Sequence, residues 1–220
     1  MKKYYEAYDE RYKLIHKKGY SWSSNIPTPI VLDVIERYCI NNNSSILELG
    51  CGEARDASLL LDKGYNVIAS DISPEAIDYC IRNNTKYKDK FIVLDCLNDE
   101  HNNKYDFIYG IALIHMLVED SDRNRFYKFI YDHLKSSGKA LICSMGNGID
   151  EISSDTSEAF ELAIRNHESG DILVPSTSLR MVSFKTFEKE LSDNKFTILE
   201  KGITSSLPDF NNLMYVVIQK

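Results

Sequence analysis

Acidic side chains and a pair of glycines stand at the ends of three predicted strands. Glu48 lies inside the end of the first strand and is followed by Gly50 and Gly52. Asp71 closes the second strand, and Asp95 follows the third. Glycine lets a backbone approach a ligand closely, and carboxylates accept hydrogen bonds from hydroxyls and amines. This set suits an uncharged nucleoside or a cationic ligand better than a phosphate group.

The spacing of these residues further restricts the class of ligand that the site could bind. An acid roughly 20 residues after a nucleotide-binding loop commonly accepts the hydroxyls of a ribose, and Asp71 stands at about that distance. A dinucleotide site would want a third glycine where Arg55 stands, and a triphosphate loop would want Gly-Lys-Ser/Thr. Both of these sites are therefore disfavoured.

The elements that position these residues are predicted from short apolar runs that alternate with helical patterns. Two final runs are joined by a short polar connection at 209–212, which favours an antiparallel last pair. We expect an α/β fold: a doubly wound, mostly parallel seven-stranded sheet with helices on both faces and an antiparallel last strand. The predicted strands are 45–49, 66–70, 91–94, 106–110, 139–145, 196–200 and 213–218.

Local signals mark where the elements begin and end. Thr28 and Ser73, each followed by proline, are predicted helix N-caps. Gly64 is predicted as a left-handed helix cap, and residues 136–138 as a turn into the fifth strand.

A chain of 220 residues fits one domain. We expect four segments of this domain to have different roles. In an open parallel sheet, ligands bind beyond the carboxyl ends of the strands. The expected parts are a helical cap at 1–40, a cofactor-binding core at 45–145, an insertion or lid at 146–183, and a C-terminal helix and strand pair at 184–220.

The order Glu48-Leu49-Gly50-Cys51-Gly52, Asp71, Asp95 and 105–108 resembles the motif set of class I S-adenosylmethionine-dependent methyltransferases. The resemblance covers roughly 45–145 and implies S-adenosyl-L-methionine as cofactor. It implies that the segment from Gly50 to Gly52 passes under the methionyl part. Glu48 would orient the cofactor's amino group, and Asp71, next to Ile72, would hold the ribose.

The same resemblance assigns the rest of the cofactor site. Asp95 would accept the adenine amino group, the backbone of Cys96 would meet the ring, and Ile111 would line the methionyl side. Arg55 has two open readings, contact with the cofactor carboxylate or a surface salt bridge. Residues 52–56, the aromatic N-terminus and the size also look like the tellurite-resistance and thiopurine methyltransferase group.

For the reaction, a sulfonium already carries a good leaving group, so the protein mainly aligns the reactants and excludes water. A general base helps if the acceptor is a thiol, hydroxyl or protonated amine. His115 follows the fourth strand and is the candidate; it has an alternative reading as a packed core histidine.

The acceptor side is expected on the N-terminal segment and the insertion. Tyr4, Tyr8 and Tyr12 share one predicted helix face. Tyr12, with His16 and Trp22, either closes over the methyl group or packs the helix against the sheet. In the insertion, Arg180 either holds an acidic acceptor or is a surface arginine.

Composition restricts the partners. Asp and Glu outnumber Lys and Arg by 33 to 26, which disfavours binding to a nucleic-acid backbone. Five scattered cysteines show no zinc spacing and fit reduced thiols. We see no signal peptide and no apolar run that reaches a membrane span, so we expect a cytoplasmic protein with no membrane partner and no metal.

The predicted function is methyl transfer to a small-molecule acceptor. One alternative is a catalytically inactive protein of the same fold that binds the cofactor or a partner, because fold does not prove activity. A nicotinamide-dependent oxidoreductase is disfavoured by the missing third glycine and by Glu48 within the first strand. The acceptor, the methylated atom and the oligomeric state are not readable from the sequence.

Overall fold

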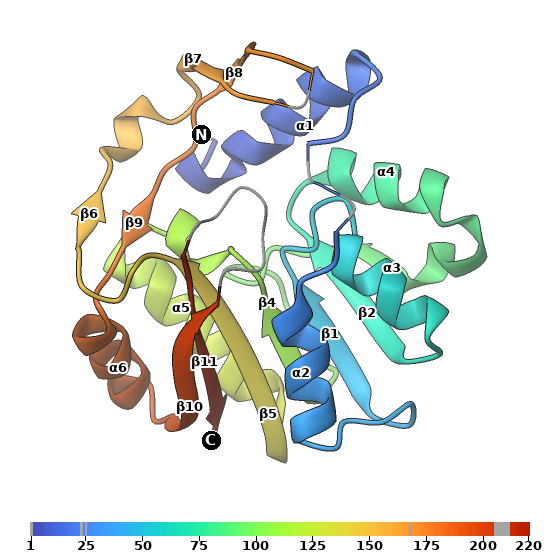
Figure 1. Ribbon diagram of the computed structural model, residues 1–220, viewed down its shortest axis with the longest axis vertical. Coiled ribbons are helices and arrows are strands. Elements are labelled where there is room, and N and C mark those ends of the chain that lie inside the picture. The colour runs from blue at the N-terminus through green and yellow to red at the C-terminus, as the bar shows by residue number, and fades with distance from the viewer. Residues whose placement is uncertain (1, 23, 25, 168, 205–211) are drawn as a thin grey trace.

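Strands and helices alternate along much of the chain, and seven of the strands form one central sheet (Figure 1). The computed structural model describes residues 2–22, 24, 26–167, 169–204 and 212–220. The elements are, in chain order, η1 (Tyr4–Glu6), α1 (Ala7–Lys17), α2 (Pro29–Arg37), β1 (Ser45–Leu49), α3 (Arg55–Asp62), β2 (Asn66–Asp71), α4 (Pro74–Asn83), η2 (Thr85–Lys90), β3 (Phe91–Val93), β4 (Tyr105–Gly110), η3 (Ile114–Met116), α5 (Asp120–His133), β5 (Leu134–Met145), β6 (Ile152–Ser153), η4 (Thr156–Glu158), β7 (Leu162–Arg165), β8 (Ile172–Pro175), β9 (Arg180–Met181), α6 (Phe184–Asp193), β10 (Thr197–Thr204) and β11 (Leu213–Gln219).

The central sheet has seven strands in the order β10-β11-β5-β4-β1-β2-β3. Neighbours from β3 to β5 run parallel, whereas β11 is antiparallel to both β5 and β10. The prediction of a mostly parallel sheet with an antiparallel last strand is confirmed. Strand order reverses between β1 and β4, and ligands bind at such a switch point in open α/β sheets.

The expected turn at 136–138 is wrong. Helix α5 passes directly into β5 at Leu134, and residues 136–138 lie inside that strand. The register with β4 shifts between the pairs Tyr105↔Leu134 and Phe107↔Lys139. The turn-forming residues therefore accommodate an irregularity within the strand, as small residues often do at bulges.

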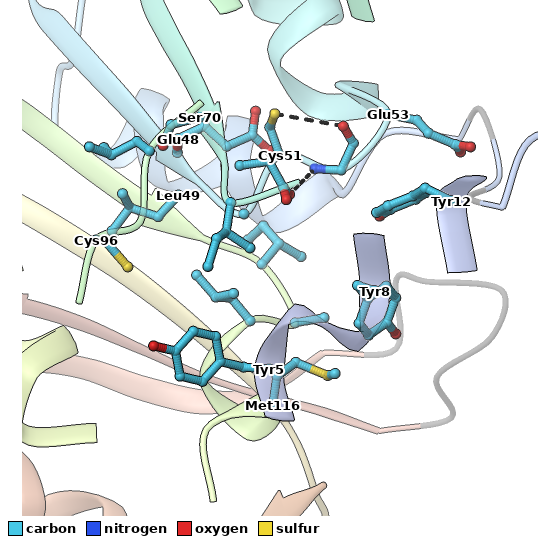
Figure 2. Close-up of a pocket in the computed structure, with 18 of the residues that line it drawn as sticks. Tyr5, Tyr8, Tyr12, Glu48, Leu49, Cys51, Glu53, Ser70, Cys96 and Met116 are labelled. Carbon is cyan, nitrogen blue, oxygen red and sulfur yellow. Dashed lines mark hydrogen bonds between the residues drawn. The ribbon is translucent and has the colours of Figure 1, made fainter. Parts of the chain in front are cut away.

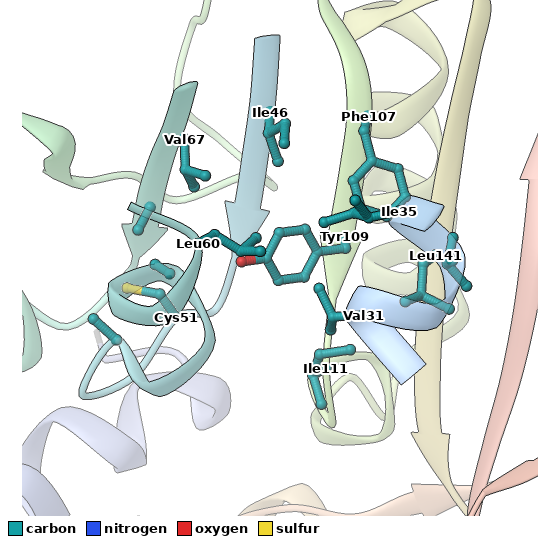
Figure 3. Packing of buried hydrophobic residues seen from close by; sticks show 14 of the residues in the cluster. Val31, Ile35, Ile46, Cys51, Leu60, Val67, Phe107, Tyr109, Ile111 and Leu141 are labelled. Carbon is teal, nitrogen blue, oxygen red and sulfur yellow. The ribbon is translucent and has the colours of Figure 1, made fainter. Parts of the chain in front are cut away.

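Both faces of the sheet are covered, because the strand residues alternate between them. On one face, Ile46 belongs to a core that includes residues of α2, α3 and α4. Figure 3 shows Val31 of α2 and Leu60 of α3 beside Tyr109 in this core. Leu47 faces the opposite core, which α5 and α6 complete. Burying side chains of this size contributes roughly 1.5–3 kcal/mol each.

The helix ends follow the predicted signals with one exception. Ser73 caps α4 by accepting from the backbone N–H of Ala76, and Gly64 has φ +84°. Thr28 occupies the N-cap of α2, but its side chain makes no cap hydrogen bond. Its hydroxyl donates to the Asp56 carboxylate at 2.8 Å instead, so it joins α2 to α3.

An N-terminal helix and a small insertion lie beyond one end of the sheet. The insertion follows β5 and forms two short antiparallel pairs, β6 with β9 and β7 with β8. Ile172 and Val174 of β8 pack against Ile15 of α1, and Figure 1 shows β7 and β8 above that helix. The predicted 209–212 connection falls almost wholly outside the described residues. Within the described ranges, no helix combines the length and apolarity needed to cross a bilayer.

Candidate functional site

A large open cavity lies between the carboxyl ends of the central strands and the N-terminal helix (Figure 2). It encloses about 1340 Å³ of empty volume, including solvent at its mouth. Its strand-end floor is formed by Glu48, residues 50–52, Asp71 and residues 95–96, so the three predicted acids line one cavity. Its aromatic wall is formed by Tyr5, Tyr8, Tyr12 and Trp22.

The glycine loop after β1 is held in left-handed backbone conformations. Gly50 and Gly52 have φ +68° and +54°, which glycine adopts without steric cost. A Cβ on Gly52 would lie 2.7 Å from the Tyr12 hydroxyl oxygen, so α1 approaches this loop closely. Ala54 also has a positive φ, +62°, at the N-cap of α3. The sequence analysis missed Ala54, although its alternate spacing after Gly50 and Gly52 was the available signal.

Glu48 is a buried acid of the floor. Only 3 % of the residue is exposed, and its Oε2 has no hydrogen-bond partner among the described residues. Burial, reinforced by the nearby Asp56 carboxylate, raises the pKa of Glu48 well above its ordinary value. An unpartnered buried carboxyl is costly, so this atom is suited to receive a ligand donor.

Asp71 joins the second strand end to the glycine loop. Its Oδ2 accepts the Gly52 N–H at 2.8 Å, and its Oδ1 accepts the Ser73 N–H at 2.9 Å. Burial raises the pKa of Asp71, while these two backbone hydrogen bonds act in the opposite direction. A carboxylate offers about four lone-pair sites, so Asp71 retains acceptor capacity toward the cavity.

Asp95 shapes the turn after β3. Its Oδ1 accepts the Leu97 N–H at 2.9 Å, and its Oδ2 accepts from the Asn98 side-chain amide at 2.6 Å. Cys96 follows on the cavity lining, where burial raises the pKa of its thiol. Asp95 therefore has a structural role in the turn as well as a place on the floor.

Arg55 begins α3 and also lines the cavity. Its Nη2 donates to the Thr28 hydroxyl at 2.8 Å and to Asp56 Oδ2 at 3.0 Å. Asp56 is 3 % exposed, so this is a mostly buried ion pair and not the surface salt bridge considered from the sequence. The Arg55 Nε is buried and has no partner among the described residues.

Two residues of the floor each have a buried polar atom that lacks a hydrogen-bond partner among the described residues. Glu48 and Arg55 both line the cavity, and each has one buried polar atom, Oε2 and Nε, without a hydrogen-bond partner among the described residues. A carboxyl accepts hydrogen bonds from amines and a guanidinium donates to carboxylates, so the floor carries one group of each kind. Ile72 and Ile111 add apolar lining between the polar groups.

The aromatic wall comes mainly from the N-terminal segment. Tyr8 and Tyr12 lie on α1 with ring centroids 5.8 Å apart. Tyr4, expected on the same face, points elsewhere and donates to Asp122 at 2.7 Å. The 3-10 turn η1 changes the periodicity before α1 begins, so that Tyr5 takes the place on the wall.

His16 lies outside the cavity lining. Its ring stacks on Tyr79 at 4.3 Å and on Tyr12 at 5.7 Å. Its Nδ1 is 2.8 Å from Glu75, and its Nε2 is 2.9 Å from Glu53. His16 therefore joins α1 to the glycine loop and to α4, which corresponds to the packing alternative. Trp22 does line the cavity, and its backbone N–H donates to Glu53 at 2.7 Å.

His115 does not line the cavity either, although Met116 beside it does. The residue is 4 % exposed, and its Nδ1 accepts from the Met145 N–H at 3.4 Å. Burial, together with the positive charge of Arg123, lowers the pKa of His115 to about 4. The structure thus places the expected general base behind the lining, in the arrangement of a packed core histidine.

Arg180 is also outside the cavity lining. Its Nη1 donates to the Val118 carbonyl at 2.7 Å and to Asp120 at 2.6 Å. Its guanidinium is therefore bound within the protein and does not present itself to an acidic acceptor. Sequence reasoning missed Tyr5, Leu117 and Ser24, which do line the cavity.

Comparisons with known proteins agree with this geometry. Residues 46–138 match the family model described as a methyltransferase domain. A search of curated protein sequences found no match. The CcbJ methyltransferase from Streptomyces caelestis superposes with a TM-score of 0.70 at 13% identity, covering 99% of this chain and 98% of that one.

Two further solved structures share the fold. One is the glycopeptide N-methyltransferase MtfA complexed with S-adenosyl-L-methionine, with a TM-score of 0.62, 16% identity, and coverage of 85% of both chains. The other is the Burkholderia thailandensis 1,6-didemethyltoxoflavin-N1-methyltransferase with bound 1,6-didemethyltoxoflavin and S-adenosylhomocysteine. It has a TM-score of 0.65 and 13% identity, and the match covers 87% of this chain and 76% of that one.

Proposed function

We propose that this chain, a class I S-adenosylmethionine-dependent methyltransferase, transfers the methyl group to a small-molecule acceptor bound under the aromatic wall. The observation that carries the proposal is the convergence of Glu48, Asp71 and Asp95 with the glycine loop on one cavity. The 1,6-didemethyltoxoflavin bound in the structure of the 1,6-didemethyltoxoflavin-N1-methyltransferase, which shares the fold, supports the choice of acceptor class.

We assign the floor to the cofactor residue by residue. Glu48 and Arg55 hold the amino and carboxylate groups through the atoms that lack partners in the described chain. The backbone of residues 50–52 passes under the methionyl part, and Asp71 accepts the ribose hydroxyls. Asp95 and the backbone of Cys96 meet the adenine, with Ile72 and Ile111 as apolar lining.

When bound, the cofactor supplies an electrophilic methyl group on a good leaving group. The protein then has to hold the acceptor in line with the carbon–sulfur bond and keep water away. The aromatic wall and Met116 supply that enclosure. We do not assign His115 as a general base, because its ring lies behind the lining and its pKa, lowered to about 4, makes the imidazole a weak base.

We treat residues 1–220 as one functional unit, in which the N-terminal cap and the 146–183 insertion serve the acceptor and the 45–145 core serves the cofactor. We place the protein in the cytoplasm, since its five cysteines are all free thiols. The surplus of acids argues against a nucleic-acid acceptor.

Calorimetry and labelled methyl transfer test the proposal. S-adenosylhomocysteine should bind with micromolar affinity and raise the melting temperature, whereas NAD should do neither. Incubation with labelled S-adenosylmethionine and a library of small acceptors should yield a labelled product. Cofactor binding without any product would instead support the catalytically inactive alternative, and absence of cofactor binding would refute both.

A further inference from the structure

The charges around the cavity restrict the acceptor. The lining carries five carboxyl side chains, those of Glu48, Glu53, Asp56, Asp71 and Asp95. Among the described lining residues, Arg55 alone is basic, and it already bonds Thr28 and Asp56. The residues outside the described ranges include no Lys, Arg or His. The cavity therefore repels an anionic acceptor.

A buried arginine fixes the aromatic wall from behind. The Arg11 guanidinium carbon lies 4.7 Å from the ring centroid of Tyr8 and 4.6 Å from that of Trp22. Arg11 is 3 % exposed, does not line the cavity, and donates twice to the Pro175 carbonyl, at 2.7 and 3.1 Å. Its charge is thus engaged by two rings and a carbonyl, which leaves the rings in fixed orientations.

We propose, building on the function proposed above, that the acceptor is a flat aromatic molecule that is neutral or carries an amine and bears no carboxylate or phosphate. Aromatic rings pack favourably against the rings of Tyr5 and Tyr8, and a protonated amine is attracted by the surrounding carboxylates. An added carboxylate would be desolvated beside like charges with no free cation to pair with.

Matched ligand pairs test this inference. With S-adenosylhomocysteine first shown to bind, the complex is titrated with tryptamine, tyramine and phenethylamine, and with tryptophan, tyrosine and phenylalanine. Each pair differs by one carboxylate. We expect at least one amine to bind about tenfold more tightly than its amino acid. Equal or tighter binding of the amino acids, or no binding of any amine at about 1 mM, overturns the inference. Failure of S-adenosylhomocysteine itself to bind would instead refute the proposed function.

A pair of variants tests whether the acceptor binds against the aromatic wall. Tyr8→Leu should weaken amine binding by about tenfold, since a ring–ring contact is lost, and should leave S-adenosylhomocysteine affinity unchanged. Tyr20→Leu is the matched control, because Tyr20 is 43% exposed and does not line the cavity. Unchanged amine binding in Tyr8→Leu would contradict the placement of the acceptor on this wall.

An independent observation concerns the outer face of the β7–β8 hairpin. Leu162 and Ile164 on β7 are 61% and 68% exposed, and Leu173, opposite Ile164, is 49% exposed. The other face of the hairpin packs Ile172 and Val174 on α1. A two-stranded sheet with one exposed aliphatic face is marginally stable unless something covers it.

The sequence of β7 is complementary to itself. Within the described strands β7 pairs with β8 alone, so its other edge is free. Antiparallel pairing of two copies about Ala163 would set Leu162 opposite Ile164 and Glu161 opposite Arg165. Opposed aliphatic pairs and opposite charges both stabilise neighbouring strands.

We infer that a second copy of this chain pairs with the free edge of β7, so that Leu162 and Ile164 of the two copies meet across a β7–β7 contact. The protein should sediment as a dimer at micromolar concentration, and Ile164→Lys should make it monomeric. In a Cys39→Ser background, Ala163→Cys should form an intermolecular disulfide with diamide, whereas Ser153→Cys on β6 should not. A monomeric parent protein, or a dimer unchanged by Ile164→Lys, overturns this inference.

Discussion

The strand-end floor and the aromatic wall enclose the same cavity but are built by different means. The floor is made where parallel strands end, and backbone amides and buried carboxyls define it. The wall is made of side chains on η1, on α1 and just after α1, all outside the sheet, and Arg11 and the hairpin of the insertion pack against it. The floor depends on the fold, whereas the wall can change residue by residue while the fold stays.

The strand-end floor and the aromatic wall approach each other closely at Gly52 and Tyr12. The hydroxyl oxygen of Tyr12 would lie 2.7 Å from a Cβ on Gly52, so the wall rests on the glycine loop without room for a methyl group. Substitutions on either side should therefore separate cofactor effects from acceptor effects, except at this contact.

The largest effect is expected at Asp71. Asp71→Ala removes two hydrogen bonds to a charged group, each worth roughly 1.5 kcal/mol, so S-adenosylhomocysteine affinity should fall at least about 100-fold. Isothermal titration calorimetry measures this. Asp78→Ala removes the same charge from an exposed position on α4 and should leave affinity unchanged. Equal affinity in Asp71→Ala and the parent would remove the ribose assignment.

Gly52→Ala tests the contact between floor and wall. A left-handed alanine costs roughly 1–2 kcal/mol, and its methyl group would also meet the Tyr12 hydroxyl. Cofactor affinity should fall by about tenfold, and the melting temperature should drop. Tyr12→Phe removes the hydroxyl, so the double variant should recover part of the loss. Strict additivity of the two changes in a double-mutant cycle would show that the contact is unimportant.

Glu48 should make cofactor binding depend on protons. Burial raises the pKa of Glu48 and so favours its protonated form in the free protein, whereas an approaching ammonium group favours the carboxylate. Binding of S-adenosylhomocysteine at pH 7 should release up to one proton, measured by calorimetry in buffers of different ionisation enthalpy. Glu48→Gln should abolish the release.

The raised pKa of Glu48 also affects the stability of the free protein. Because the folded-state pKa lies above the unfolded value, Glu48 stabilises the fold at low pH. That contribution is lost as pH rises from its ordinary value of 4.5. The free energy of unfolding should therefore fall less steeply with rising pH in Glu48→Gln, and an unchanged slope would contradict the burial argument.

The smallest effect on activity is expected at His115, behind the floor and wall alike. His115→Gln should change turnover less than about twofold and leave the pH profile between 6 and 8 intact. Because its folded pKa is lowered from 6.5 to about 4, the parent should lose stability as pH falls through this window. The variant should lack that loss. Disappearance of an activity inflection near neutral pH would restore His115 as a base.

The floor could be predicted from the sequence because sheet topology brings strand ends together regardless of distant contacts. Glu48, Asp71 and Asp95 were located from their places after apolar runs, and all three line the cavity. The left-handed conformation of Ala54 could not be expected from its residue type, because an alanine rarely adopts a positive φ.

The wall could be predicted only in part, since Tyr12 and Trp22 line the cavity as one alternative had it, whereas the other members depend on tertiary docking. The 3-10 turn η1 replaced Tyr4 by Tyr5 on the cavity side, a shift of one residue that no periodicity indicates. For His16 and Arg180 the sequence left ligand contact and a structural or surface role both open, and in the structure carboxylates far along the chain engage both side chains. Long-range ion pairs of this kind leave no local pattern in a sequence.

The position of His16 has a consequence for engineering. One imidazole serves two acids, Glu53 and Glu75, which belong to separate elements of the core. A chimera that exchanged α1 for another helix would lose the imidazole that joins these carboxylates, although Glu53 would keep the Trp22 N–H and Glu75 would keep Arg82. Any transplanted helix must therefore bring a donor at this position, even if all the rings that meet the acceptor have been redesigned.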